Sequence, residues 1–224
     1  MISTDGGVRA ILSELTSNDP EVSSGFLDRY QDDVCRFAQY MAGAKFAQSE
    51  IATRWLGDHE DVVYVMSIVD CAAMLHIQSM KLFLSGHIIA AGNLSRQVIE
   101  AIAVALLCSG QIPNVLRLFR EGSYRSDCAL RNLRDHRDEL GILESALSPL
   151  EDARKFYHRY SHLTTLTVAV GVPFYAPETR YIGASFDPGK IDQYDREVRS
   201  RLSLAEVFPN FIKAVDMNLA KWSK

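Results

Sequence analysis

His87-Ile-Ile-Ala-Ala-Gly-Asn-Leu-Ser-Arg-Gln-Val-Ile-Glu-Ala-Ile-Ala-Val-Ala-Leu-Leu-Cys108 is the most apolar long stretch of the chain, and Ser109-Gly110 follows it. Apolar side chains point in nearly every direction around such a helix, which is typical of a helix at the centre of a bundle rather than on its surface. Small residues along it allow neighbouring helices to approach closely, namely Ala90, Ala91, Gly92, Ala101, Ala103 and Ala105. The stretch therefore predicts the central helix of an all-α bundle, and its small residues make a homodimer plausible.

Other long segments repeat apolar residues at helical spacing around this centre. Asp19-Pro20 and Ser148-Pro149 are typical helix starts, with proline at the first helical position. We expect helices at about 7–16, 20–56 (with a possible break near Gly43), 58–84, 113–140, 148–162 and from 191 onward, the last kinked or interrupted near Pro209.

The amino-acid composition changes near residues 163–190, where a run of β-branched residues is followed by a segment rich in proline and glycine. We expect a short irregular or hairpin insertion there, with a hairpin around Tyr181-Ile182. The sequence predicts one all-helical domain over 1–224, with about six or seven helices.

Composition excludes several classes of protein. The formal net charge is −4, which argues against a protein that coats nucleic acid non-specifically. The N-terminus lacks the basic and apolar regions of a signal peptide, and the longest apolar run, Ala101 to Cys108, is too short to span a bilayer. The 4 cysteines are widely spaced, so we expect reduced, buried thiols in a cytoplasmic protein with no membrane association.

Arg131-Asn132-Leu133-Arg134-Asp135-His136 spells Arg-polar-x-x-x-His within the predicted helix 113–140. This resembles the ribonuclease motif of the HEPN superfamily. The resemblance implies metal-independent cleavage of RNA without a cofactor, with Arg131 and His136 as the catalytic pair and Asn132 orienting the site. It also implies a homodimer, because HEPN ribonucleases typically assemble this motif across two chains. In HEPN domains the motif lies toward the end of the bundle, whereas two further helices are expected after it here.

The residue types of this motif suit the chemistry, because arginine keeps its charge beside a phosphate and histidine exchanges protons near neutral pH. The five-residue separation of Arg131 and His136 suits this chemistry less well. Five residues of ideal helix turn through about 500°, so Arg131 and His136 start about 140° apart unless the helix is irregular. Asp127 and Asp135 lie four residues on either side of Arg131, so a solvated helix face with ordinary ion pairs is the alternative.

Arg96 and Glu100 form a second candidate site, four residues apart in the most apolar helix. The pair is expected to be buried and to neutralise itself, which fixes helix register. The alternative places both residues on a polar cavity with Asn93 and His87. The stretch resembles a recurring feature of bacterial helical families of unknown function, some of them thought to be HEPN relatives.

Tyr157, His158, Tyr160 and His162 form a third cluster. His158 and His162 have the spacing with which one helix presents two imidazoles to zinc, but no His-Glu-x-x-His pattern or nearby cysteine accompanies them, so no metal is expected. We interpret these residues as half-buried side chains at the end of a helix. A place in an active cleft beside His136 is the alternative.

Two hypotheses of function follow. The first is a HEPN-like, metal-independent endoribonuclease of the toxin or phage-defence kind, acting on RNA and held in check by a neutralising or defence-system partner protein. The second is a non-catalytic helical bundle that binds a small ligand or another protein, with Arg96 and Glu100 structural or lining a pocket.

Overall fold

The computed structural model describes residues 4–16, 19–55, 60–175, 180–181 and 183–222. Over these residues it contains ten α-helices, two short 3-10 helices and no strand, so the predicted all-α class is confirmed. The α-helices are α1 (Thr4–Thr16), α2 (Pro20–Trp55), α3 (Glu60–Leu84), α4 (Ile88–Ser109), α5 (Val115–Arg120), α6 (Ala129–Asp135), α7 (Arg137–Leu140), α8 (Glu144–His158), α9 (Thr165–Val170) and α10 (Ile191–Leu219). The 3-10 helices are η1 (Ser126–Cys128) and η2 (Pro188–Lys190).

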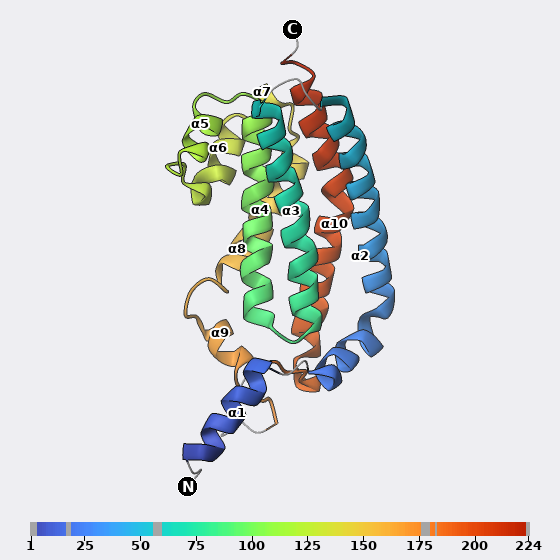
Figure 1. The fold of residues 1–224 in the computed structure, drawn as a ribbon, viewed down its shortest axis with the longest axis vertical. Helices are drawn as coiled ribbons and strands as arrows, with labels where there is room; N and C mark the ends of the chain where they lie inside the picture. The colour runs from blue at the N-terminus through green and yellow to red at the C-terminus, as the bar shows by residue number, and fades with distance from the viewer. Residues whose placement is uncertain (1–3, 17–18, 56–59, 176–179, 182, 223–224) are drawn as a thin grey trace.

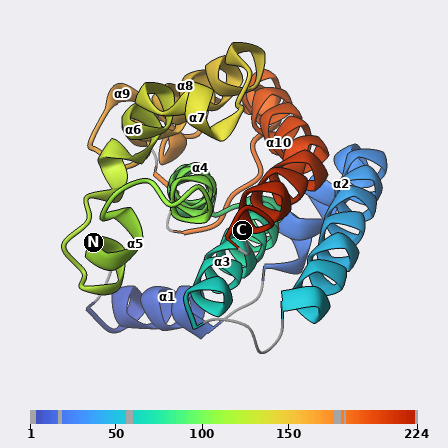
Figure 2. The ribbon, with the colours of Figure 1, turned by 90° about the horizontal axis from the view of Figure 1, so that it is seen from above.

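Four long helices, α2, α3, α4 and α10, run side by side (Figure 1). Viewed from above, α4 lies between α3 and α10 on one side and the shorter helices α5 to α9 on the other (Figure 2). Its side chains are accordingly enclosed, and Val98, Ile99 and Leu107 have 0% of their surface exposed. The prediction that the stretch 87–108 forms the central helix is confirmed. Its small residues serve contacts within the chain, as where Gly92 packs against Tyr160.

The long helices are more continuous than their sequences indicate. α2 passes Gly43 without interruption, and its one non-helical backbone conformation is at Tyr30 (φ −116°, ψ 17°). α10 likewise runs through Pro209 as one helix, although proline removes a backbone donor there. Packing against the other long helices outweighs these local preferences.

The stretch 113–140 is divided into α5, η1, α6 and α7 rather than forming one helix. Backbone conformations with positive φ stand at the breaks, at Gln111 (55°), Asn114 (62°), Gly122 (70°) and Gly141 (66°). His136 separates α6 from α7 with φ −107° and ψ 14°. These short helices fold back on α4 instead of continuing away from it.

The segment 163–190 contains the short helix α9 and, at its end, the 3-10 helix η2, and is otherwise irregular where it is described. α9 occupies the β-branched run because Thr164 and Thr167 form a capping box at its start. Residue 182 of the expected hairpin, and residues 176–179, lie outside the described residues.

Two helices, α3 and α4, are long and apolar enough to cross a membrane, with mean hydropathies of 1.5 and 1.3. This is weak evidence for a membrane span, because buried core helices have the same composition, and about half of the most apolar 18-residue window of each helix is buried here (50% and 56%). All four cysteines are free. Cys108 is buried as expected, whereas Cys35 and Cys71 are exposed, so the expectation of burial was wrong for those two.

Candidate functional site

Arg96 and Glu100 lie on the side of α4 that faces η1 and α8. The Arg96 Nε donates to Glu100 Oε1 at 2.9 Å, and the two side chains are only 19% and 12% exposed. The other carboxylate oxygen, Glu100 Oε2, accepts a hydrogen bond from the Ser126 hydroxyl at 3.1 Å. Glu100 is therefore held on both oxygens, and the predicted self-neutralising pair is present at the edge of the core. Asn93 is half-buried one turn earlier on the same face of α4 and has no hydrogen bond to a described residue.

His158 and His162 stand at the end of α8 and directly after it. Their ring centroids are 4.5 Å apart in an edge-to-face contact, and both side chains are exposed. The pKa of His158 is lowered by partial desolvation, then by the positive charges of His162, Arg96 and Arg154, while Glu100 opposes the shift. The imidazole thus lies within the electrostatic reach of the Arg96–Glu100 pair, so two candidate clusters found separately in the sequence share one location.

Arg154, on α8, completes this group. Its Nη2 donates to the backbone oxygen of Asp127 at 2.7 Å, while its Nε is buried without a partner among the described residues. We call the group the α4–α8 site, and it comprises Arg96, Glu100, Ser126, Arg154, His158 and His162. With neutral histidines, two arginines against one glutamate give it a net charge of +1.

The Arg-Asn-x-x-x-His motif takes a different arrangement. Arg131 is exposed, and its side chain forms no hydrogen bond or ion pair with any residue the structure describes. Asn132 Nδ2 donates to the Tyr124 hydroxyl at 2.9 Å, and His136 Nδ1 lies 3.3 Å from Glu139 Oε1. The helix is irregular at His136, as the pairing of Arg131 with His136 would require. The two side chains nevertheless do not interact within this chain.

The arginines around this motif are mostly paired with acids. The partners are Arg117 with Glu121, Arg120 with Glu60 and Asp61, Arg125 with Asp127, and Arg134 with Glu151. The stretch 117–134 holds five arginines and two acids, and acids from outside it, Glu60, Asp61 and Glu151, compensate most of this surplus. The face is solvated and ion-paired, but Arg131 does not form the pairs expected with Asp127 and Asp135, since Asp127 pairs with Arg125.

A buried ionic network lies behind the α4–α8 site. On α10, Glu197 and Arg201 pair with each other and both have 0% of their surface exposed. The Tyr160 hydroxyl donates to Glu197, and Arg201 Nε donates to the Ser79 hydroxyl at 2.9 Å. The Arg201 guanidinium also stands over the ring of Tyr157 at 5.6 Å.

This network fixes the segment that carries the two histidines. Tyr157 and Tyr160 are buried against α10 and α4, whereas His158 and His162 project to the outside. The inward tyrosines therefore hold the turn on which the outward imidazoles sit. The sequence pattern singled out the tyrosines but not Glu197 and Arg201, although their four-residue spacing was a signal that could have revealed them.

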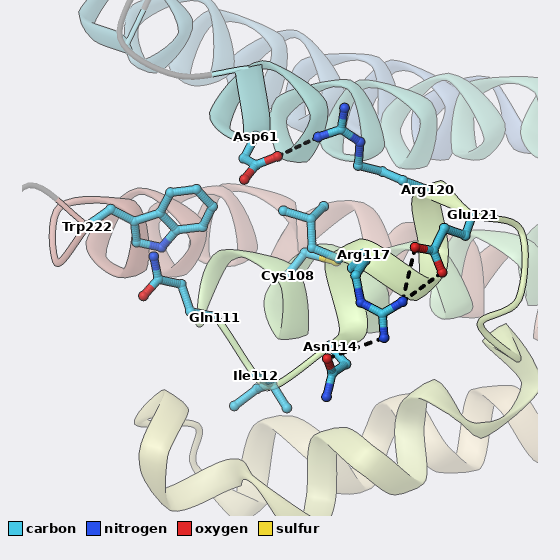
Figure 3. Close-up of a pocket in the computed structure, with 10 residues that line it drawn as sticks. Asp61, Cys108, Gln111, Ile112, Asn114, Arg117, Arg120, Glu121 and Trp222 are labelled. Atoms are coloured by element: carbon cyan, nitrogen blue, oxygen red, sulfur yellow. Dashed lines mark hydrogen bonds and ion pairs between the residues drawn. The ribbon is translucent and has the colours of Figure 1, made fainter.

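A cavity of about 690 Å³ lies elsewhere, at the end of the bundle near the C-terminus. Figure 3 shows Trp222, Cys108 and Gln111 at its wall, with Arg120 bonded to Asp61 and Arg117 to Glu121. Its charged side chains are thus already paired with one another. No residue that the sequence singled out for catalysis or binding lines it.

Within the part of the chain that the structure describes, no group of three or more His, Cys, Asp or Glu is arranged to hold a metal ion. The imidazole of His158 has Arg96, Arg154 and Glu100 among its charged neighbours, and it contacts the ring of His162. The arrangement offers proton-exchanging groups beside positive charges, which suits a phosphate-bearing ligand. The chain matches no family model, no curated protein and no solved structure.

Proposed function

We propose that this protein is a metal-independent endoribonuclease that acts at the α4–α8 site. The observation that carries the proposal is the contact of His158 with His162 beside two arginines. Metal-free RNA cleavage needs a base, an acid and a fixed positive charge, and this group of side chains supplies all three. The toxin or phage-defence role implied by the HEPN resemblance rests on the motif 131–136 and is not supported by this site.

The reaction would be an internal transfer at phosphorus. One neutral imidazole takes the proton of the ribose 2′-OH while the 2′-oxygen bonds to phosphorus. The bond from phosphorus to the 5′-oxygen breaks, and the second, protonated imidazole gives its proton to that oxygen. The products are a 2′,3′-cyclic phosphate and a 5′-OH end. Arg96 and Arg154 would hold the non-bridging oxygens.

The environment of His158 indicates which of the two roles this imidazole takes, and the other role is left to His162. Because desolvation and neighbouring positive charges lower the pKa of His158, this imidazole is neutral near pH 7 and suits the base. The imidazole of His162 is then the acid. Both side chains are exposed, so the rings can turn apart to admit a phosphate between them.

The test is cleavage of a mixed RNA pool in EDTA by the wild type and three glutamine variants. We expect His158→Gln and His162→Gln each to lose at least about 100-fold in rate. His136→Gln is the matched control, because its side chain is one-third exposed (33%) and contacts only Glu139, and we expect it to keep full activity. Melting temperatures of all variants should stay within a few degrees of the wild type.

Each other outcome has a defined meaning. Loss of activity only in His136→Gln would move the site to Arg131, Asn132 and His136 and would contradict our assignment. No cleavage by any protein, with product ends assayed directly, would reject the ribonuclease function.

A second candidate function is binding of a phosphate-bearing ligand without turnover. The observation in its favour is that Arg96 and Ser126 hold both oxygens of Glu100 in place beside the two histidines. This candidate predicts saturable binding of a short RNA that depends on Arg154 and His158, with no cleavage at any protein concentration.

A further inference from the structure

α1 carries an apolar stripe that nothing in the described chain covers. Four side chains spaced at three, one and three residues share one face of the helix, and each is more than half exposed: Val8 52%, Ile11 55%, Leu12 54% and Leu15 75%. The helix projects from the end of the bundle (Figure 1), and Glu14 accepts a hydrogen bond from the Ala184 N–H at 3.3 Å. Contiguous exposed apolar residues of this kind mark an interaction site.

An apolar groove lies between α2 and α3, with a volume of about 540 Å³. Its floor is formed by Phe37, Met41 and Met80, which are buried, and its rims carry Leu27 (42% exposed) and Ile77 (40% exposed). A groove between two packed helices is the usual receptor for a third amphipathic helix, which inserts side chains spaced by three and four residues. The chain therefore bears both an uncovered apolar helix and an uncovered apolar groove.

Charge distinguishes between a lipid surface and a protein as the partner of α1. The sequence of α1 has one arginine, no lysine, one aspartate and one glutamate, which gives a net charge of −1. A helix that lies on an anionic membrane is rich in lysine and arginine on its polar face, so α1 does not have that composition. The groove is lined by Lys81, whose sign is complementary to that of α1, and by Lys45, which is paired with Asp70 within its own chain.

Area distinguishes between a foreign helix and a second copy of this chain. A helix of about 20 Å length and 10 Å diameter buries about 300 Å² on its docked half, and about 600 Å² when the groove is included. One such contact is below the 1,200 Å² or so that stable interfaces bury, whereas two reciprocal contacts reach about that value. Reciprocal exchange also closes the assembly with two-fold symmetry and leaves no unpaired groove.

We propose that two copies of this chain form a symmetric dimer in which α1 of each copy lies in the α2–α3 groove of the other. The stripe Val8, Ile11, Leu12 and Leu15 contacts the groove floor. This interface lies on the bundle face formed by α2 and α3, whereas the α4–α8 site is built on α4, η1 and α8. The proposal therefore does not depend on the ribonuclease function.

The first test is the mass of the full chain in solution, measured by light scattering after size exclusion over a range of concentrations. We expect the wild type at twice the 25.1 kDa chain mass. Leu12→Asp with Leu15→Asp, and separately Ala38→Arg in the groove, should each give the single-chain mass. These positions are exposed, so the variants should keep the helical content of the wild type. The matched control is Leu143→Asp, an equally drastic change at a residue 71% exposed elsewhere, which should remain dimeric.

The second test distinguishes exchange between copies from docking of α1 on its own groove. Leu15→Cys is combined with Ala38→Cys after the accessible Cys35, Cys71 and Cys128 are changed to serine, and a short bis-maleimide is added. A covalent dimer that needs both new cysteines supports the proposal.

A cross-linked monomer would show docking within one chain and would overturn the proposal. A wild type of single-chain mass at every concentration would overturn it as well. The proposal would also fall if a monomeric wild type sedimented with vesicles of phosphatidylcholine and phosphatidylserine, because the stripe would then be a lipid-binding face.

Discussion

The side chain of Arg201 is among the largest that the core encloses completely, and its partner Glu197 is equally buried. Removing one member of a buried ion pair leaves an uncompensated charge in the core. We therefore expect Arg201→Met to lower the free energy of unfolding by about 3–5 kcal/mol. Urea denaturation followed by circular dichroism measures this loss.

The matched variant replaces both residues, as in Glu197→Met with Arg201→Met. Because neither charge is then left alone, the double variant should be more stable than Arg201→Met by itself. Equal stability of the single and double variants would mean that the pair does not act as a unit.

The ion pairs Arg96–Glu100 and Glu197–Arg201 differ in how well their burial can be predicted from the sequence. Arg96 and Glu100 could be predicted as a buried pair because almost every neighbour in that helix is apolar. Glu197 and Arg201 have the same spacing, but they stand among Arg196 and Arg199, so the segment has the charge density of a surface helix. Burial of that pair depends on residues from α3 and α8 that are far away in sequence.

At the scale of elements, the approach of α4 to the end of α8 depends on Gly92. A Cβ atom at this position would lie 2.5 Å from Cγ of Tyr160, which is closer than any real contact. Gly92→Ala should therefore cost about 1–3 kcal/mol through overpacking, against about 1 kcal/mol gained from helix propensity. We expect a net decrease in the melting temperature.

Gly43 provides the control, because it also lies inside a helix but a Cβ atom added there would have nothing within 4 Å. Gly43→Ala should raise the melting temperature, since only the gain in helix propensity acts there. Shifts of the same sign in both variants would contradict the packing argument.

Elements that depend on backbone conformation were harder to predict than elements defined by apolar periodicity. The central helix and its neighbours follow from the spacing of apolar residues alone. The division of 113–140 does not. Left-handed conformations at Gln111 and Asn114 delay the start of α5, and another at Gly122 follows its end. His136 marks a further break that no helix-ending residue signals. As a result the motif 131–136 was predicted on one helix but lies across the junction of two.

At the scale of the whole molecule, only part of the candidate site could be predicted from the sequence. The sequence identified Arg96, Glu100, His158 and His162, because each belongs to a four-residue spacing within one helical stretch. It did not place them together, and it left Arg154 and Ser126 out. Their convergence depends on how α8 and η1 pack against α4, which is a property of the tertiary fold rather than of any local pattern.

The stability of the whole chain should depend on pH through His76, which lies at the centre of the bundle. Its ring stacks on Phe208 with centroids 5.3 Å apart, and its Nε2 lies 3.0 Å from the backbone oxygen of Arg201. Desolvation is the main cause that lowers the pKa of His76 to about 3, while that hydrogen bond opposes the shift. The imidazole is therefore neutral in the folded protein and charged in the unfolded chain at mildly acidic pH.

The direction of the effect follows from proton binding. Between pH 6.5 and 3 the unfolded chain binds a proton at His76 that the folded chain does not, so stability rises with pH over this window. The contribution is complete above pH 6.5 and is lost as the pH falls, by about 2 kcal/mol between pH 6.5 and 4.5. His76→Gln should be less stable than the wild type at pH 7 but should lose less stability on acidification. Carboxylates that titrate in the same range are common to both proteins, so urea denaturation of the two in parallel isolates the contribution of His76, and identical pH slopes would show that its burial does not control the acid sensitivity of the fold.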